Sequence, residues 1–163
     1  MPTAEAAAAR RDRVFLVVVD DSPERAVALR YAALRARKSG GRVALLRVLE
    51  PVGLVEWAGV GQMMAEERRQ EAEALLSGLA AEVQEITGGI PIVIIREGEP
   101  REELLKLLEE DPRISILVLA AAPGGGGPGP LITALTGRHS HRLRVPMTIV
   151  PGELSEAELE RVT

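Results

Sequence analysis

The chain has 163 residues, a formal net charge of −4 and 46% hydrophobic residues, which is the balance of an ordinary globular protein of one domain. It contains no cysteine, which excludes disulfide scaffolds, thiol nucleophiles and cysteine-ligated zinc. The acidic charge, with one residue each of Phe, Tyr and Trp, argues against nucleic acid and anionic membranes as partners.

The N-terminal segment differs from a secretory signal. Its alanines precede the charged residues 10–13, whereas a signal has its charge first and a longer apolar stretch second. No apolar run approaches the roughly 18 residues of a membrane span. We therefore expect residues 1–12 to form a disordered tail and the protein to be cytoplasmic.

The first predicted strand is the uninterrupted apolar run from Val14 to Val19. Its lack of alternation is typical of a strand that is covered on both faces, as in a parallel sheet. An aspartate pair follows, and Ser22 is predicted to cap a helix that has Pro23 at its first position. This helix is expected to end near Gly40, where glycines follow basic residues.

Strands and helices continue to alternate along the rest of the chain. The other predicted strands cover residues 43–49, 90–95, 114–119 and 145–150. The other predicted helices cover residues 62–87, a segment that opens at Glu99–Pro100, and residues 131–143 with a break at Gly137. Residues 50–61 are expected to form a loop. This order predicts an α/β fold over residues 13–152, an open five-stranded parallel sheet with helices on both faces, followed by a C-terminal tail over 153–163.

A glycine-rich segment, 123–130, lies between the fourth strand and the next helix. Glycine allows backbone N–H groups to turn toward an anion, although the same composition also fits a simple flexible connector. No Gly-Lys-Ser/Thr follows, which excludes a Walker-type loop, and a Rossmann fingerprint would follow the first strand. Ligands of such sheets bind beyond the carboxyl ends of the strands, so we expect this loop and Asp20 to meet at one edge.

The ordered set of segments resembles the universal stress protein family. Gly124, Gly127 and Gly137 have the Gly-x2-Gly-x9-Gly spacing of its nucleotide-binding members. Further matches are the first strand with its aspartate, the second strand, the Gly-x-Pro before the third helix and the last strand, in residues 17–22, 45–51, 98–100 and 145–150. The resemblance covers residues 13–151 and implies the strand order 3-2-1-4-5.

The chain departs from the family pattern in the phosphate motif. Arg138 stands where the family has a small hydroxyl residue, and Ser140 is the nearest hydroxyl. Arg138 either contacts phosphate by a charge-assisted bond or fills the phosphate space. An alignment anchored on the strand instead places Ala120 or Ala121 at the first glycine, with an insertion of three or four residues in the loop.

The resemblance implies a site for ATP or AMP, with Mg²⁺ reaching Asp20 and no cofactor needed for folding. Adenine and ribose would lie near Val19, Asp20, Ser22 and Val48. The phosphates would lie on Gly124, Gly127, Gly137, Arg138 and Ser140. The implied function is that of a stress-linked sensor or regulator, with slow ATP hydrolysis at most and no predicted catalytic residue.

Two other functions stay open. A dimeric interaction module without nucleotide would pair Val145–Val150 with the same strand of a second copy, since an exposed apolar edge strand needs cover. A receiver-like phosphoacceptor would need an aspartate after the third strand, where Arg96 and Glu97 stand. His139 and His141 are about 200° apart on a helix, so no metal site is predicted.

Overall fold

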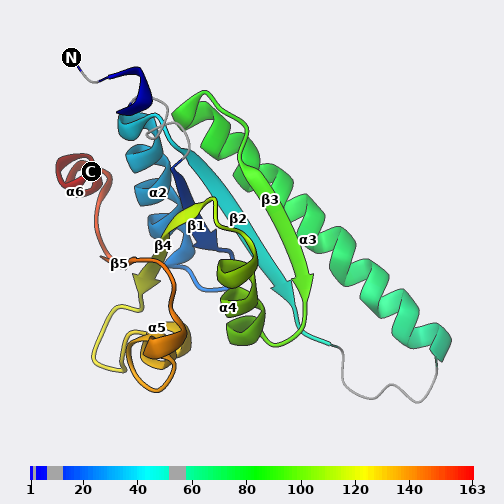
Figure 1. The fold of residues 1–163 in the computed structure, drawn as a ribbon. Helices are drawn as coiled ribbons and strands as arrows, with labels where there is room; N and C mark the ends of the chain where they lie inside the picture. Colours follow the sequence, from blue (N-terminus) through cyan, green and yellow to red (C-terminus); the bar gives the residue numbers. More distant parts are fainter. Residues whose placement is uncertain (2, 7–12, 52–57) are drawn as a thin grey trace.

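The computed structural model describes residues 1, 3–6, 13–51 and 58–163, and it confirms the predicted fold. Five parallel strands form an open sheet in the order β3-β2-β1-β4-β5 (Figure 1). The strands are β1 (Val14–Val18), β2 (Arg42–Leu49), β3 (Ile92–Glu97), β4 (Ile114–Ala121) and β5 (Met147–Pro151). The helices are α2 (Arg25–Ser39), α3 (Ala58–Thr87), α4 (Pro100–Glu110), α5 (Pro130–Thr136) and α6 (Glu156–Val162), with a 3-10 turn at Ser140–Arg142.

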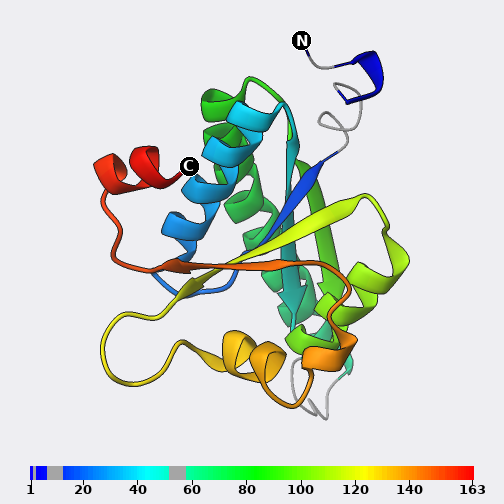
Figure 2. The same cartoon turned by 60° about the vertical axis from the view of Figure 1, so that its left-hand side comes forward.

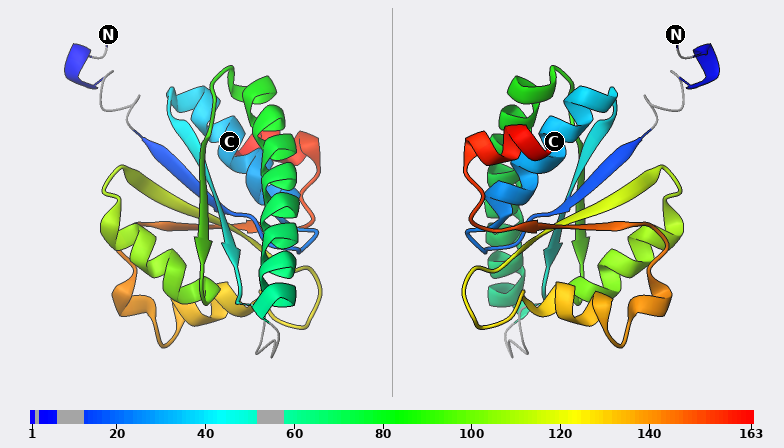
Figure 3. Two further views of the ribbon diagram at one scale, coloured as in Figure 1. Left: turned by 90° about the vertical axis from the view of Figure 1, so that its right-hand side faces the viewer. Right: turned by 90° about the vertical axis from the view of Figure 1, so that its left-hand side faces the viewer.

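Helices cover both faces of the sheet. The α2, α3 and α6 helices lie on one face, and α4 and α5 lie on the other (Figure 3). Successive residues of β1 point to opposite faces, so Phe15 and Val17 pack with the first group, whereas Leu16 and Val18 pack with the second. All residues of β1 are buried. This explains the uninterrupted apolar run and fixes the strand that leads into Asp20.

The start of α2 differs from the prediction. The helix begins at Arg25 and its N-cap is Glu24, so Ser22 does not cap it and Pro23 is not its first residue. The Ser22 hydroxyl instead donates to Asp20 Oδ1 over 2.6 Å. The Ser22 hydroxyl thus takes part in a local turn with Asp20, two residues before the N-cap of α2.

Other boundaries also differ from the prediction. The α3 helix begins at Ala58, inside the segment predicted as a loop, of which residues 52–57 lie outside the described residues. The β3 strand begins at Ile92 because Pro91 before it has no N–H to give to the sheet. The predicted break at Gly137 is confirmed, since α5 ends at Thr136 with Gly137 as its C-cap and a separate 3-10 turn begins at Ser140.

The C-terminal segment forms the helix α6, which packs against α2 (Figure 2). Leu159 is buried in the core on that face, and Ser155 and Glu158 form a capping box at the start of the helix. The N-terminal tail predicted over residues 1–12 falls largely outside the described residues. None of the helices in the described ranges is long and apolar enough to cross a membrane.

Candidate functional site

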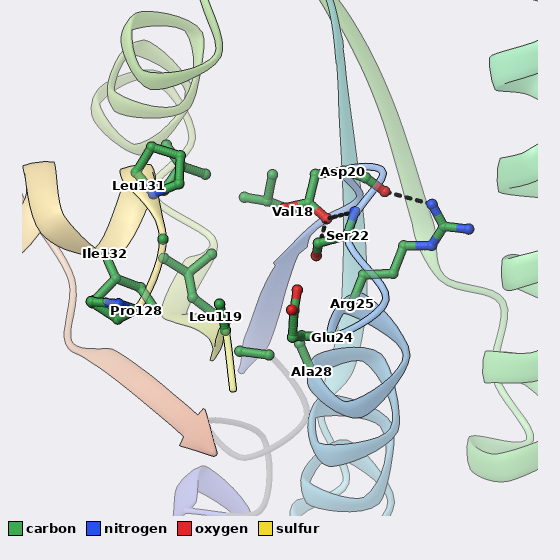
Figure 4. A pocket seen from close by; sticks show the side chains of 14 residues that line it. Val18, Asp20, Ser22, Glu24, Arg25, Ala28, Leu119, Pro128, Leu131 and Ile132 are labelled. Carbon is green, nitrogen blue, oxygen red and sulfur yellow. Dashed lines mark hydrogen bonds between the residues drawn. The ribbon is translucent and has the colours of Figure 1, made fainter. Parts of the chain in front are cut away.

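The strand order reverses between β1 and β4, since β1 leads toward β2 and β4 leads toward β5. A pocket of about 260 Å³ lies at the carboxyl ends of these two strands (Figure 4). We name it the β1–β4 pocket. It is lined by Val18, Asp20, Ser22, Glu24, Arg25, Ala28, Leu119, Ala120, Ala122, Pro128, Gly129, Pro130, Leu131 and Ile132. Such a switch point is the usual place for a ligand in an open α/β sheet.

A second hollow of about 200 Å³ adjoins it at the ends of β1 and β2. We name it the β1–β2 pocket. It is lined by Val18, Val19, Asp20, Asp21, Arg47, Val48, Glu50, Arg68, Pro100 and Leu131. Both pockets share Val18, Asp20 and Leu131. Asp20 thus stands at the junction of the two hollows.

The carboxylate of Asp20 has a fixed orientation. Its Oδ1 accepts from the Ser22 backbone N–H over 2.9 Å and from the Ser22 hydroxyl over 2.6 Å. Arg25 donates to the Asp20 carbonyl oxygen over 2.5 Å. The side chain is nevertheless exposed to solvent, so its carboxylate can accept bonds from a ligand.

Two arginines that the sequence analysis did not single out line the β1–β2 pocket. Arg47 donates to the Val19 carbonyl and to Asp21 Oδ1, each over 3.0 Å. Arg68, on α3, donates to the Glu50 carbonyl over 2.7 Å. The signal for Arg47 was its charge within the otherwise apolar strand 43–49, whereas Arg68 sits in a run of charged residues and carries no such signal.

The glycines predicted to hold phosphate line neither of these pockets. Gly124 and Gly127 are exposed, with no atom within 4 Å of an added Cβ. The loop instead reaches the β1–β4 pocket through Pro128–Pro130, and the Ala122 N–H closes it by donating to the Pro128 carbonyl over 3.1 Å. The structure therefore brings Val19, Asp20, Ser22 and Val48 together, and it places Gly124, Gly127, Gly137, Arg138 and Ser140 outside both hollows.

Comparison with known proteins identifies the family. The profile of the universal stress protein family matches residues 13–151. The chain belongs to the universal stress protein family. No curated protein sequence shows significant similarity to it.

Solved structures of other universal stress proteins share the fold. UspA from Lactobacillus plantarum has a TM-score of 0.73 and 16% identity, covering 86% of this chain and 98% of that one. A universal stress protein in complex with cAMP has a TM-score of 0.60 and 16% identity, covering 86% and 98%. An Arabidopsis thaliana family member with AMP bound has a TM-score of 0.58 and 16% identity, covering 85% and 91%.

In this universal stress protein, the segment after Gly137 is tied to α4. Arg142 Nη1 donates to both carboxylate oxygens of Glu102, over 2.8 and 3.0 Å. These hydrogen bonds hold the pKa of Glu102 below its ordinary value and raise the pKa of Arg142. His139 lies close enough to Glu102 to contribute to the lowering. Across residues 13–51 and 58–163, no group of three or more His, Asp and Glu residues is arranged to hold a metal ion.

Proposed function

We propose that this universal stress protein binds an adenine nucleotide, ATP or AMP, at the carboxyl edge of its sheet and acts as a stress-linked sensor or regulator. The observation that carries this proposal is the pair of adjoining pockets at the switch point, with Asp20 between them. The relatives crystallised with cAMP and with AMP support the same ligand class.

The chemistry of the two pockets fits a nucleoside. An exposed carboxylate such as Asp20 can accept hydrogen bonds from both ribose hydroxyls. Val48, which is half-buried, offers apolar surface to a base in the β1–β2 pocket, and Val19 lines the same pocket. Mg²⁺ would arrive with the nucleotide, because this ion is usually held by one or two carboxylates together with phosphate oxygens, and Asp20 is the carboxylate expected to reach it.

Calorimetry and thermal-shift measurements with AMP and ATP, in the presence of Mg²⁺, test the proposal. We expect binding of AMP with a rise in melting temperature, since a ligand that binds only the folded state stabilises it. GMP is the control for the base. The absence of heat and of any thermal shift at millimolar AMP and ATP would contradict the proposed function.

A second candidate function is that of a dimeric interaction module, with β5 as the seam. The β5 strand pairs with β4 on one side only, and no strand among the described residues pairs with its other side (Figure 2). Ile149 on this edge is 43% exposed. An exposed apolar edge strand is a template for pairing with another chain.

Sedimentation velocity at micromolar protein tests this second candidate. We expect a dimer for the natural chain and a monomer for Ile149→Lys, since a charge on the edge opposes strand pairing. A natural chain that sediments as a monomer would rule out this seam. A dimer that ignores added AMP and ATP would favour the interaction module over nucleotide binding.

A further inference from the structure

The side chains that line the β1–β4 pocket favour some adenine nucleotides over others. The inference below rests on the proposed function. We propose that the site prefers an adenine nucleoside or nucleoside monophosphate over the triphosphate, and that Glu24 is the residue that disfavours additional phosphates. Four observations carry this proposal: the position of Glu24, the orientation of Arg25, the charge around the start of α2, and the prolines of the loop.

Glu24 places a second carboxylate in the β1–β4 pocket. It is half-buried at the start of α2, and Figure 4 shows its carboxylate beside Ser22 and Ala28, on the side of α2 that faces the pocket. Its side chain makes no capping hydrogen bond, so the carboxylate is not committed to the helix. Its stem packs closely on Gly152, where an added Cβ would lie 2.8 Å from Glu24 Cγ.

The one cationic side chain that lines this pocket is turned away from it. Arg25 donates to the carbonyl oxygen of Asp20, and in Figure 4 its side chain extends away from Leu119 and Ile132 across the pocket. A phosphate chain entering between β1 and β4 would therefore meet the carboxylates of Asp20 and Glu24 before it met a guanidinium. At an effective dielectric constant of about 20, two like charges about 8 Å apart repel enough to change an affinity by about tenfold or more.

The electropositive end of α2 does not offset this repulsion. The first turn of a helix attracts anions through its free N–H groups. Here the N–H groups of Arg25 and Val27 already donate to the Ser22 and Glu24 carbonyl oxygens, and the N-cap residue, Glu24, itself carries a negative charge. The attraction of this helix end for a further anion is thus reduced before a ligand arrives.

The loop offers few amide donors where it reaches the pocket. Pro128 and Pro130 line the pocket and have no N–H. The N–H of Ala122 is already bonded to the Pro128 carbonyl, and that of Thr133 to the Gly129 carbonyl. Beyond Ala122, the lining residues on the loop side that keep an N–H are Gly129, Leu131 and Ile132. This short set of main-chain donors suits one phosphate better than a chain of three.

The experiment is a calorimetric series with adenosine, AMP, ADP and ATP on the natural chain and on Glu24→Gln, first with EDTA and then with excess Mg²⁺. For the natural chain we expect adenosine and AMP to bind within about threefold of each other and ATP to bind about tenfold more weakly. In Glu24→Gln we expect the gap between AMP and ATP to shrink by about fivefold, with adenosine unchanged. Glu153→Gln, the same change at an exposed carboxylate that lines neither pocket, should leave every ratio as it is.

The outcomes separate this inference from the proposed function. If no adenine ligand binds, both fail. If ATP binds as tightly as AMP, or if Glu24→Gln leaves the ratio unchanged, only the preference for fewer phosphates fails. Tighter binding of ATP than of AMP once Mg²⁺ is added would also overturn the inference, because it would make Glu24 a partner of the metal and not an obstacle to phosphate.

Discussion

The two halves of the candidate site are built in different ways. The half around Asp20 follows a strand that is buried on both faces, and short hydrogen bonds from Ser22 fix its carboxylate. The half formed by residues 123–129 is an exposed loop that one backbone bond, from Ala122 to Pro128, closes at its base. Spacing in the sequence is therefore a weaker guide to position than attachment to a packed strand.

The physical reason lies in what each half can bury. Residues of β1 contribute apolar side chains to both cores, so the strand and its end have one position. Glycines contribute no side chain to any core, and the loop gains little from one conformation over another. The predictions below measure this difference, from the largest expected effect to the smallest.

Truncating the support of Asp20 should have the largest effect. Leu16→Ala removes a side chain that is 0% exposed in the core beneath α4 and α5. We expect a loss of about 2–5 kcal/mol in the free energy of unfolding, measured with urea, because the truncation leaves a cavity. Gly126→Ala in the loop, where an added Cβ meets nothing within 4 Å, is the control and should change the free energy little. Similar losses in both variants would erase the contrast between the two halves.

Removing the carboxylate from the half around Asp20 should have the next largest effect. Asp20→Ala deletes the proposed acceptor for the ribose hydroxyls, and we expect AMP binding to weaken by about 10–100-fold in calorimetry. Ser22→Ala keeps the carboxylate but removes the hydroxyl bond that orients it, so a smaller loss is expected. Unchanged affinity in Asp20→Ala would place the nucleotide elsewhere.

A strained loop position should have a moderate effect. Gly127 has φ = 91°, a conformation that costs a residue with a Cβ about 1–2 kcal/mol. Gly127→Ala should therefore lower the free energy of unfolding by that amount, whereas Gly126→Ala, whose φ is not positive, should not. If Gly127→Ala leaves the free energy of unfolding unchanged, the loop does not hold this conformation in solution. The loop half of the site would then be less ordered, relative to the Asp20 half, than described.

The smallest effect concerns the ion pair that anchors the segment after the loop. The pKa of Glu102 is lowered in the folded state by its bonds to Arg142, from an ordinary value of 4.5. Its stabilising contribution is therefore present above pH 4.5 and is lost as the pH falls through the lowered value. Melting temperatures of the natural chain and of Glu102→Gln should differ slightly at pH 7 and converge in acid.

Two further variants check that this effect belongs to the pair. Glu102→Gln should have no additional effect in an Arg142→Gln background, because the partner is already gone. Glu71→Gln changes an exposed glutamate on α3 and should not reproduce the acid-dependent difference. A difference that persists at low pH would show that Glu102 acts through packing and not through its charge.

Much of the fold follows from local patterns in the sequence. Short runs rich in apolar and β-branched residues predicted five strands, and the break at Gly137 was predicted from a glycine within a helical pattern. The cap of α2 was predicted wrongly, because the helix begins at Arg25, so Ser22 stands two residues before the N-cap and its hydroxyl donates to Asp20. Capping propensity alone does not fix the residue at which a helix begins.

The site was predictable only in part, and for a related reason. Asp20 follows β1 and Val48 is the last residue but one of β2, so the topology carries both to one edge of the sheet. The loop residues that line the β1–β4 pocket are Pro128–Pro130. They stand at the end of the turn that the hydrogen bond from the Ala122 N–H to the Pro128 carbonyl closes. Arg68 lies 19 residues beyond the end of β2 in sequence, and only the packing of α3 brings it to the β1–β2 pocket.

The wall shared by the two pockets restricts the shape of any molecule that fills both. Val18, Asp20 and Leu131 line each hollow, so a single occupant of both must pass over these three residues. A molecule whose two parts are joined by a rotatable bond can adjust to each hollow separately, whereas a rigid molecule must match both at once. Fragment screens against this chain should therefore yield two families of small hits, one for each hollow, which a short flexible linker would unite.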